Sequence, residues 1–453
     1  MDFIETVKSA GIVGAGGAGF PTHVKLNAKA EYFIINAAEC EPLIETDKFI
    51  CRKYADEMID AVVQTAAHLQ AQKIVIAIKA IYKAEIESLQ AAIKRAGAKI
   101  EICGMPAFYP AGDEQTMVQF VTGRSVPERG LPLQVGAVVD NVGTMLNLHY
   151  AMKGQPVCDK FLSVVGEVKE TTMLRVPLGT SVVECINQAG PLLEWGEYAI
   201  IMGGPMMGKV VVGDDIKNTV VTKTTGNIIV LPKDHYLISR ALKPIEGIRH
   251  MAKSSCIQCR FCTDMCPRYQ TGHKILPHLV MRNFWRENSI TDDEEFVRCF
   301  GSALNCCDCG VCEMFACPMN LSPRKANGYF KVKLRERGLD MPKNQEPHAL
   351  PTINHKRIAT SRLVARLGLN KYYGRHAHDE FIDYTPKSVF VPFSQHIGKP
   401  AQPVVKAGDK VEKGQLIAAA AEGALSTNIH TGFAGVVKSV DAKGAVISSE
   451  GRK

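Results

Sequence analysis

The sequence predicts a multidomain protein in which an α/β domain is combined with domains of α+β and β-rich character. Its 453 residues are enough for about three domains. Strand and helix patterns alternate near the N-terminus, cysteines concentrate in the middle, and short β-like segments bounded by Gly and Pro fill two further regions. These changes predict an α/β domain (1–152), a small β-rich domain (153–235), a cysteine-rich domain (240–340), a basic linker (341–384) and a C-terminal β domain (385–453).

Composition and charge are those of an ordinary globular protein, with 46% hydrophobic and 22% charged residues. No apolar run reaches the roughly 18 residues that a membrane-spanning helix needs. The first residues, MDFIETVKSAG, lack a basic segment followed by an apolar one, so we expect no signal peptide and a cytoplasmic protein. The net charge of +8 is spread along the chain without a Lys/Arg block, and we expect no nucleic-acid binding.

The N-terminal region begins with a glycine-rich segment, GAGGAGFPTH. Gly14-x-Gly16-x-x-Gly19 has the spacing of a dinucleotide-binding fingerprint, and Glu39 lies 20 residues after Gly19, where a ribose-binding acid would be expected. Downstream, 31–37 and 73–79 are apolar runs typical of buried strands, and 83–97 has the pattern of an amphipathic helix that ends at a glycine.

A Rossmann site would place a strand directly before this loop and a helix directly after it. The preceding residues, DFIETVKSAG, look helical instead, and Pro21 delays the following helix. We therefore expect a mobile loop whose backbone N–H groups approach a flat ring and its phosphate. Lys25 falls one turn into the helix, where it could meet an anion.

The second and last regions are predicted to consist of short strands. In the second region these are 161–168, 171–177, 181–186 (SVVECI), 198–204 and 209–213. In the last region they are 388–393, 403–408, 415–421, 435–440 and 445–449.

Two cysteine runs carry the strongest chemical signal, because clustered cysteines without a secretion signal favour metal ligation over disulfides. The first is Cys256-x2-Cys259-x2-Cys262-x3-Cys266-Pro267, the bacterial ferredoxin spacing, in which the fourth cysteine binds the other cluster. The second is Cys306-x2-Cys309-x2-Cys312-x4-Cys317-Pro318. We predict two [4Fe–4S] clusters, one held by Cys256, Cys259, Cys262 and Cys317, the other by Cys306, Cys309, Cys312 and Cys266.

Two alternatives accompany this assignment. The second run has one extra residue before Cys317, and Cys307 competes with Cys306 as a ligand. Four thiolates also suit Zn²⁺, although zinc sites usually consist of two CxxC pairs separated by a longer loop. The remaining cysteines are expected to be buried and inert: Cys40, Cys51, Cys103, Cys158, Cys185, Cys299 and Cys307.

The glycine-rich segment, GAGGAGFPTHVK, resembles the FMN/NADH loop of the 51 kDa flavoprotein subunit of respiratory complex I and of Rnf C subunits. Three later segments agree in order: 36–42 (NAAECEP), 109–116 (YPAGDEQT) and 138–144 (VVDNVGT). Ala15 and Ala38 stand where the family has Arg and Asp, on the nicotinamide side. The resemblance implies non-covalent FMN, with NADH docking over it, bound along Gly14, Gly16, Gly17, Gly19, Lys25, Asn36, Glu39, Gly112, Asp113, Glu114, Asn141 and Thr144.

Two other regions resemble known modules. RVPLGTSVVECINQAG followed by MGGPMMG is similar to the SLBB (soluble-ligand-binding β-grasp) domain, which implies either a cobalamin-type ligand or a packing role. Segments 405–418 and 429–437 resemble the two half-motifs of the barrel-sandwich hybrid of lipoyl and biotinyl carriers. No lysine lies between Lys413 and Lys438, so we expect a docking or structural module without covalent lipoyl or biotin.

The expected fold is therefore an FMN-binding α/β domain of the complex I 51 kDa type, an SLBB β-grasp domain, a two-cluster ferredoxin-like helical domain and a C-terminal barrel-sandwich hybrid. In Rnf C subunits the sandwich precedes the flavin domain, whereas here it comes last. Length, this order and the twin cysteine runs resemble the cobalamin reductases of bacterial propanediol-utilisation microcompartments.

This resemblance implies NADH as donor, FMN as the converter between hydride and single electrons, and cobalamin as acceptor, with no catalytic side chain. It also implies a location within a microcompartment, with a cobalamin adenosyltransferase and shell proteins as partners. Two alternatives remain at this point: an Rnf-type subunit that feeds electrons to a ferredoxin or quinone, and a microcompartment scaffold with vestigial clusters. Nothing in the sequence indicates an oligomeric state.

Overall fold

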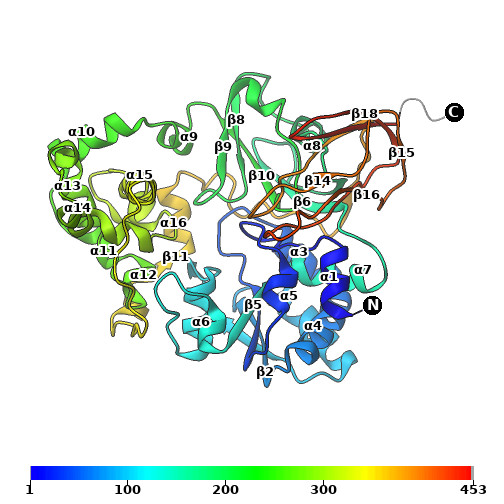
Figure 1. The fold of residues 1–453 in the computed structure, drawn as a ribbon, viewed down its shortest axis with the longest axis horizontal. Helices are drawn as coiled ribbons and strands as arrows, with labels where there is room; N and C mark the ends of the chain where they lie inside the picture. Colours follow the sequence, from blue (N-terminus) through cyan, green and yellow to red (C-terminus); the bar gives the residue numbers. More distant parts are fainter. Residues whose placement is uncertain (1, 450–453) are drawn as a thin grey trace.

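The structure is a computed structural model, and it describes residues 2–449. Figure 1 shows the N-terminal domain at the bottom, the second domain and the C-terminal sandwich above it, and the cysteine-rich helices at the left. Among residues 2–449, no helix combines the length and the apolar character needed to cross a bilayer.

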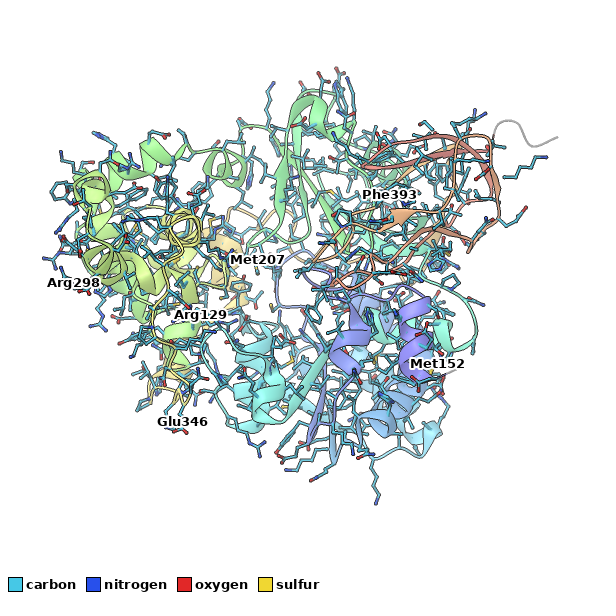
Figure 2. The ribbon with its side chains drawn as sticks, viewed as in Figure 1. Arg129, Met152, Met207, Arg298, Glu346 and Phe393 are labelled. Atoms are coloured by element: carbon cyan, nitrogen blue, oxygen red, sulfur yellow. The ribbon has the colours of Figure 1, made fainter. Side chains whose placement is uncertain are left out.

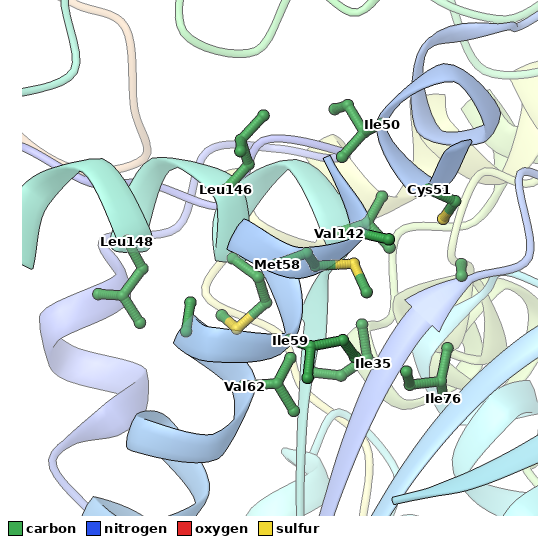
Figure 3. Packing of buried hydrophobic residues seen from close by; sticks show 14 of the residues in the cluster. Ile35, Ile50, Cys51, Met58, Ile59, Val62, Ile76, Val142, Leu146 and Leu148 are labelled. Atoms are coloured by element: carbon green, nitrogen blue, oxygen red, sulfur yellow. The ribbon is translucent and has the colours of Figure 1, made fainter. Parts of the chain in front are cut away.

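The N-terminal domain is built on a four-stranded parallel sheet with the order β3-β2-β1-β5. Its central strand β1 is buried on both faces, as expected for a parallel sheet covered by helices. Phe33 and Ile35 pack with α4 and α7, as Figure 3 shows for Ile35, while Tyr32 and Ile34 pack on the opposite side with α6. The domain comprises α1 (Phe3–Ser9), α2 (Thr22–Leu26), β1 (Tyr32–Ala37), α3 (Thr46–Lys53), α4 (Ala55–Leu69), β2 (Lys73–Lys79), α5 (Lys83–Ala96), β3 (Glu101–Met105), β4 (Phe108–Tyr109), α6 (Glu114–Thr122), η1 (Pro132–Val135), β5 (Ala137–Asn141) and α7 (Val142–Met152).

The strands and the helix predicted in this domain are confirmed by β1, β2 and α5. Gly97 ends α5 in the left-handed conformation, with φ of 61°, as a C-terminal glycine is expected to do.

The second domain is a six-stranded mixed sheet with the order β12-β7-β6-β10-β8-β9, to which the distant segment β12 (Phe381–Asp383) adds an edge strand. The strand predicted at 181–186 is wrong, because this segment lies in α8. Val182, Cys185, Ile186 and Ala189 form one buried face of that helix, a 3.6-residue pattern that six residues are too short to distinguish from a strand. The elements are β6 (Asp159–Gly166), β7 (Thr172–Pro177), α8 (Val182–Ala189), β8 (Tyr198–Met202), β9 (Lys209–Val211), η2 (Gly213–Ile216) and β10 (Asn227–Pro232).

The cysteine-rich domain is helical and is held together by aromatic packing. Phe300 stacks on Phe330 with ring centroids 3.7 Å apart, and Phe284 and Phe296 meet the same cluster edge-on. Its elements, with the connecting α9, are α9 (Tyr236–Ala241), α10 (Ile245–Ser255), α11 (Phe261–Asp264), α12 (Pro267–Gln270), α13 (Pro277–Asn283), η3 (Phe284–Ser289), α14 (Asp293–Phe300), η4 (Gly301–Asn305), η5 (Cys312–Ala316) and α15 (Pro323–Glu336).

The segment 341–384, expected to be a linker, contains short elements that join two neighbouring domains. β11 (Ile358–Ala359) pairs with β4 of the N-terminal domain, and β12 (Phe381–Asp383) extends the sheet of the second domain beside β7. Between them lie η6 (Ile353–His355), which precedes β11, and α16 (Thr360–Arg366).

The C-terminal domain packs a four-stranded sheet, β13-β19-β18-β15, with a three-stranded sheet, β14-β16-β17, around one apolar core. Its strands are β13 (Ser388–Pro392), β14 (Gln402–Pro403), β15 (Lys410–Val411), β16 (Leu416–Ala419), β17 (Ile429–His430), β18 (Gly435–Val440) and β19 (Gly444–Ser448).

Candidate functional site

A cavity of about 720 Å³ lies where the N-terminal, second and C-terminal domains meet. The tip of the glycine loop, Gly16–Ala18, forms part of its wall. The second domain contributes the segment around Met207, which lies near the middle of the molecule in Figure 2. The C-terminal domain contributes Lys413 and Gly414. A cavity shared by three domains can hold a ligand that none of them would enclose alone.

The glycine loop has the unusual setting that the sequence predicted. The helix α1 precedes it, Val13 and Pro21 close it with an isolated β-bridge, and α2 begins only at Thr22. The strand–loop–helix arrangement of a Rossmann site is therefore absent among the described residues around this loop.

The tip of this loop is an open cradle of donors. The N–H groups of Gly16, Gly17 and Ala18 donate no hydrogen bond within residues 2–449, and all three residues are exposed in the cavity. A Cβ atom at Gly17 would meet no atom within 4 Å, whereas one at Gly16 would lie 2.6 Å from Asn141 Nδ2. Successive free N–H groups of this kind suit an anion such as a phosphate, so the loop fits the group that FMN would present.

The base of the loop is fixed while its tip stays free. Ala15 N donates to Thr144 Oγ1 at 3.0 Å, and Gly14 N donates to Phe20 O at 3.0 Å. Gly19 adopts φ of 75° and accepts a hydrogen bond of 3.1 Å from Ile397 N of the C-terminal domain. The C-terminal domain therefore helps to hold the loop in place.

Asn36 and Asn141 lie at the carboxyl ends of β1 and β5, the edge at which parallel sheets bind ligands. Asn36 Nδ2 donates to Gly112 O at 2.9 Å. Asn141 Oδ1 caps α7 by accepting from Gly143 N at 2.8 Å, and its Nδ2 donates to Asp47 Oδ2 at 2.6 Å. These amides brace the floor of the site.

The ammonium group of Lys25 already has hydrogen-bond and charge partners within the N-terminal domain. Its Nζ donates to Val139 O at 2.7 Å and lies 3.4 Å from Asp140 Oδ1 and 3.5 Å from Glu114 Oε1. Burial alone would lower the pKa of Lys25, but these two carboxylates raise it. The lysine that the sequence places at an anion thus has two protein carboxylates beside it.

Asp113 faces the cysteine-rich domain and caps α6, accepting from Thr116 N at 2.9 Å. Burial alone would raise its pKa, but the guanidinium of Arg268 lowers it. Of the residues that the resemblance assigns to FMN, the cavity is lined by Gly16, Gly17, Glu39 and Asn141. The others do not line it: Gly14, Gly19, Lys25, Asn36, Gly112, Asp113, Glu114 and Thr144.

Carboxyl groups that the sequence analysis did not single out line the same cavity. Glu41 accepts hydrogen bonds from Met206 N at 2.7 Å and Met207 N at 3.3 Å, and a side chain at Gly204 would collide with it. Burial raises the pKa of Glu41 to about 7 and that of Asp47 to about 6. Glu41 could have been found from the sequence, because it lies within the 36–42 segment that resembles the family. Asp47 lies in none of the segments that carry the resemblance.

Cations from the other two domains were also missed, because each is distant in sequence from the glycine loop. Arg175 and Lys413 both bind Asp159 Oδ2, at 3.1 and 2.6 Å. Lys160 is only 8% exposed and donates to Ala15 O at 3.3 Å. Burial lowers the pKa of Lys160 to about 8.

The structure brings together the four cysteines predicted for the first cluster. They line one small cavity, with Cys317 from the second run facing the first run: Cys256, Cys259, Cys262 and Cys317. Cys266 lies instead with the second run, where burial and the neighbouring thiols of Cys306 and Cys266 raise the pKa of Cys312. Cys307 also lies next to the second set, because its thiol shares a hydrogen bond with Cys309 that lowers the pKa of Cys307.

Within residues 2–449, no three His, Cys, Asp or Glu side chains converge tightly enough to hold a single metal ion.

The two cysteine sets differ in how exposed they are to solvent. Tyr109 of the N-terminal domain donates from its hydroxyl to Cys309 O at 2.7 Å, so the second set adjoins that domain. In the first set Cys259 is exposed, and the neighbouring Ile257 is 60% exposed. The second set is thus the more buried of the two, with Cys266, Cys309 and Cys312 buried and Cys306 half-buried, and the first set reaches the surface at Cys259.

Family models match the chain domain by domain and confirm the expected modules. They are the Nuo51 FMN-binding domain (residues 7–150), the SLBB domain (161–210), a 4Fe-4S dicluster domain (255–322) and the RnfC barrel sandwich hybrid domain (373–451).

Whole proteins match as well. The chain is 38% identical over 442 residues to cobalamin reductase PduS of Citrobacter freundii, covering 96% of this chain and 94% of the relative. It is 36% identical over 446 residues to PduS of Salmonella typhimurium, covering 98% and 95%. The C subunit of the proton-translocating ferredoxin:NAD(+) oxidoreductase complex of Clostridium ljungdahlii is 33% identical, over 59% of this chain and 56% of that protein. With its domains in this order and its match along nearly the full length, the chain belongs to the PduS family of cobalamin reductases.

Proposed function

We propose that this chain is an NADH-dependent flavoprotein that reduces cobalamin, with FMN and two [4Fe–4S] clusters as electron carriers. The observation that carries the proposal is the match to cobalamin reductases along 96% of the chain. One NADH would yield NAD⁺, a proton and two electrons, enough to convert two cob(III)alamins to cob(II)alamin or to continue toward Co(I).

Residues of the N-terminal domain would hold the flavin. The free N–H groups of Gly16, Gly17 and Ala18 would bind phosphate, and Asn36 and Asn141 would keep the loop and sheet edge in place. When bound, FMN supplies the exchange between a two-electron hydride and single electrons, and the clusters carry one electron at a time. Glu39, Glu41 and Asp47 give the cavity an acidic wall.

The cysteine arrangement supports two clusters that exchange their fourth ligands. Cys317 would complete the set of Cys256, Cys259 and Cys262, and Cys266 would complete the set of Cys306, Cys309 and Cys312. The contact of the second set with the N-terminal domain and the exposure of Cys259 in the first set favour an electron path from the cavity to the second set, then to the first set and out to an acceptor.

We further propose that the protein works in the cytoplasm within a bacterial microcompartment, beside a cobalamin adenosyltransferase and shell proteins. This part rests on the family alone. The Rnf-type alternative, with a ferredoxin or quinone as acceptor, draws support from the 33% identity to the Clostridium ljungdahlii protein, but that relationship spans only 59% of the chain. A scaffold role would leave both cysteine sets without a purpose.

The deciding experiment is anaerobic turnover of the purified holoprotein, after its FMN, iron and sulfide have been quantified. With NADH and cob(III)alamin, the corrin spectrum should change to that of cob(II)alamin, and flavin-depleted protein should lose this activity. Fast reduction of a ferredoxin beside inert cobalamin would favour the Rnf-type function. The enzyme proposal fails if the holoprotein oxidises no NADH with any one-electron acceptor.

A further inference from the structure

Lys160 is a buried lysine that forms no ion pair within 4 Å among residues 2–449. It lies on β6 of the second domain, is 8% exposed and lines the cavity behind the glycine loop. Its hydrogen bond is to the carbonyl oxygen of Ala15, at 3.3 Å. The acid that acts on it electrostatically, Asp47, forms no ion pair with it within 4 Å and instead accepts from Asn141 Nδ2.

The other cations of this region are balanced differently. Lys25 lies between two carboxylates, and Arg175 and Lys413 share Asp159. Lys223 is also buried and bonded only to carbonyls, but it lies outside the lining of the cavity. Lys160 therefore combines burial, a position on the cavity wall and the lack of a close ion pair among the described residues.

Burying an ammonium group without a close counter-charge is unfavourable, so such a group is expected where an anion completes its surroundings. The free N–H groups of Gly16, Gly17 and Ala18 lie on the same wall, directly after the Ala15 carbonyl that Lys160 contacts. Donors and cation thus come from two different domains and converge on one place.

We propose that Lys160 binds a nucleotide phosphate together with the N–H groups of Gly16, Gly17 and Ala18. The proposal rests on the proposed function in that the nucleotide is either FMN or the nicotinamide dinucleotide. It makes the second domain part of the nucleotide site, with a role beyond that of a spacer between the flavin and the clusters.

The test compares Lys160→Met and Lys160→Arg with the unaltered full-length protein. The control is Lys217→Met, which removes an exposed lysine of the same domain that lies outside the cavity lining and pairs with Asp214. Flavin is released anaerobically, and FMN and riboflavin, which lacks the phosphate, are titrated separately by fluorescence. NADH affinity is then measured from the rate of flavin reduction in reloaded protein. Circular dichroism establishes that each variant is folded.

If Lys160 binds the FMN phosphate, Lys160→Met should weaken FMN about 10- to 100-fold, as expected for a charge-assisted hydrogen bond, and leave riboflavin unchanged. If it binds the dinucleotide, FMN affinity should persist while the apparent Kd for NADH rises by a similar factor. In either case Lys160→Arg should retain most of the affinity, and Lys217→Met should match the unaltered protein.

The proposal is overturned if Lys160→Met binds FMN and NADH as the unaltered protein does. It is also overturned if FMN and riboflavin weaken equally, because Lys160 would then only brace the Ala15 carbonyl. The FMN and riboflavin titrations need no turnover, so they decide the role of Lys160 toward flavin even if cobalamin reduction is not observed.

Discussion

Arg268 donates two hydrogen bonds, of 2.6 and 2.9 Å, to the carboxylate of Asp113 across the boundary between the cysteine-rich and N-terminal domains. Arg268 follows Cys266 by two residues, and Asp113 caps α6. This bidentate pair therefore fixes the second cysteine set against the domain that carries the glycine loop.

Breaking this pair should both destabilise the protein and disturb electron flow. In Arg268→Met the buried carboxylate of Asp113 loses its cationic partner and keeps only the hydrogen bonds from Thr116, a change that costs about 3–5 kcal/mol. We expect a lower urea midpoint and slower reoxidation of the flavin by the clusters in stopped-flow traces. The double variant Asp113→Asn/Arg268→Met should recover part of the stability, and strictly additive losses would mean that the two residues are not coupled.

Exchange of the fourth cluster ligands predicts crossed damage. Cys266→Ala should impair the cluster held by Cys306, Cys309 and Cys312, because Cys266 lies with that set. Cys317→Ala should impair the cluster of the first run, whose small cavity Cys317 completes. Paired Mössbauer and EPR spectra of the two anaerobic variants measure this. Damage confined in each variant to the cluster of its own run would contradict the exchange.

Gly17 should be sensitive to a side chain for reasons of binding alone. A methyl group there meets no protein atom within 4 Å, so Gly17→Ala should change the free energy of unfolding by no more than about 0.5 kcal/mol. The same methyl group enters the cavity, and FMN content after anaerobic reconstitution should fall. The control is Ala18→Gly, which adds no atom to the tip of the loop and should retain flavin. Gly154→Ala would not serve as a control, because Gly154 has φ of 78° and a side chain there would strain the backbone. Unchanged flavin content in Gly17→Ala would place the ligand elsewhere.

Lys223 should make stability depend on pH. Its Nζ donates to Gly11 O at 2.5 Å and Asn428 O at 2.6 Å, and burial lowers its pKa from 10.5 to about 7. Between these values the unfolded chain binds more protons than the folded one, so this group makes the free energy of unfolding rise with pH. The contribution is about 2 kcal/mol between pH 7 and 9.

Urea unfolding at pH 7, 8 and 9 measures this dependence. Lys223→Met should flatten the rise, while the exposed Lys217→Met should keep it. An equally steep rise in Lys223→Met would show that other groups, such as Lys160, are responsible.

The features that could be predicted from the sequence are those that depend on a few neighbouring residues. The apolar runs of β1 and β2, the glycine that ends α5 and the spacing of the two cysteine runs are each contained within a few residues. The segment 181–186 failed because its apolar residues fit a strand as well as the first turns of α8.

The walls of the cavity could not be predicted in the same way. Lys160 reaches the glycine loop from 145 residues along the chain, and Lys413 joins Asp159 across 254 residues. Only the packing of three domains places these groups together, and no periodicity in the sequence records that packing. Asp113 illustrates the same limit, because its partner Arg268 belongs to another domain.

The docking of the C-terminal sandwich also bears on how such proteins can be rearranged in evolution. Ile397 N donates to Gly19 O at 3.1 Å, and Asn428 Nδ2 donates to Ser9 O at 3.2 Å, so the last domain lies against the first helix and its loop. An interface of this kind does not depend on which domain is translated first. Both surfaces are carried by the domains themselves, so a chain in which the sandwich preceded the flavin domain would still present each of them to the other.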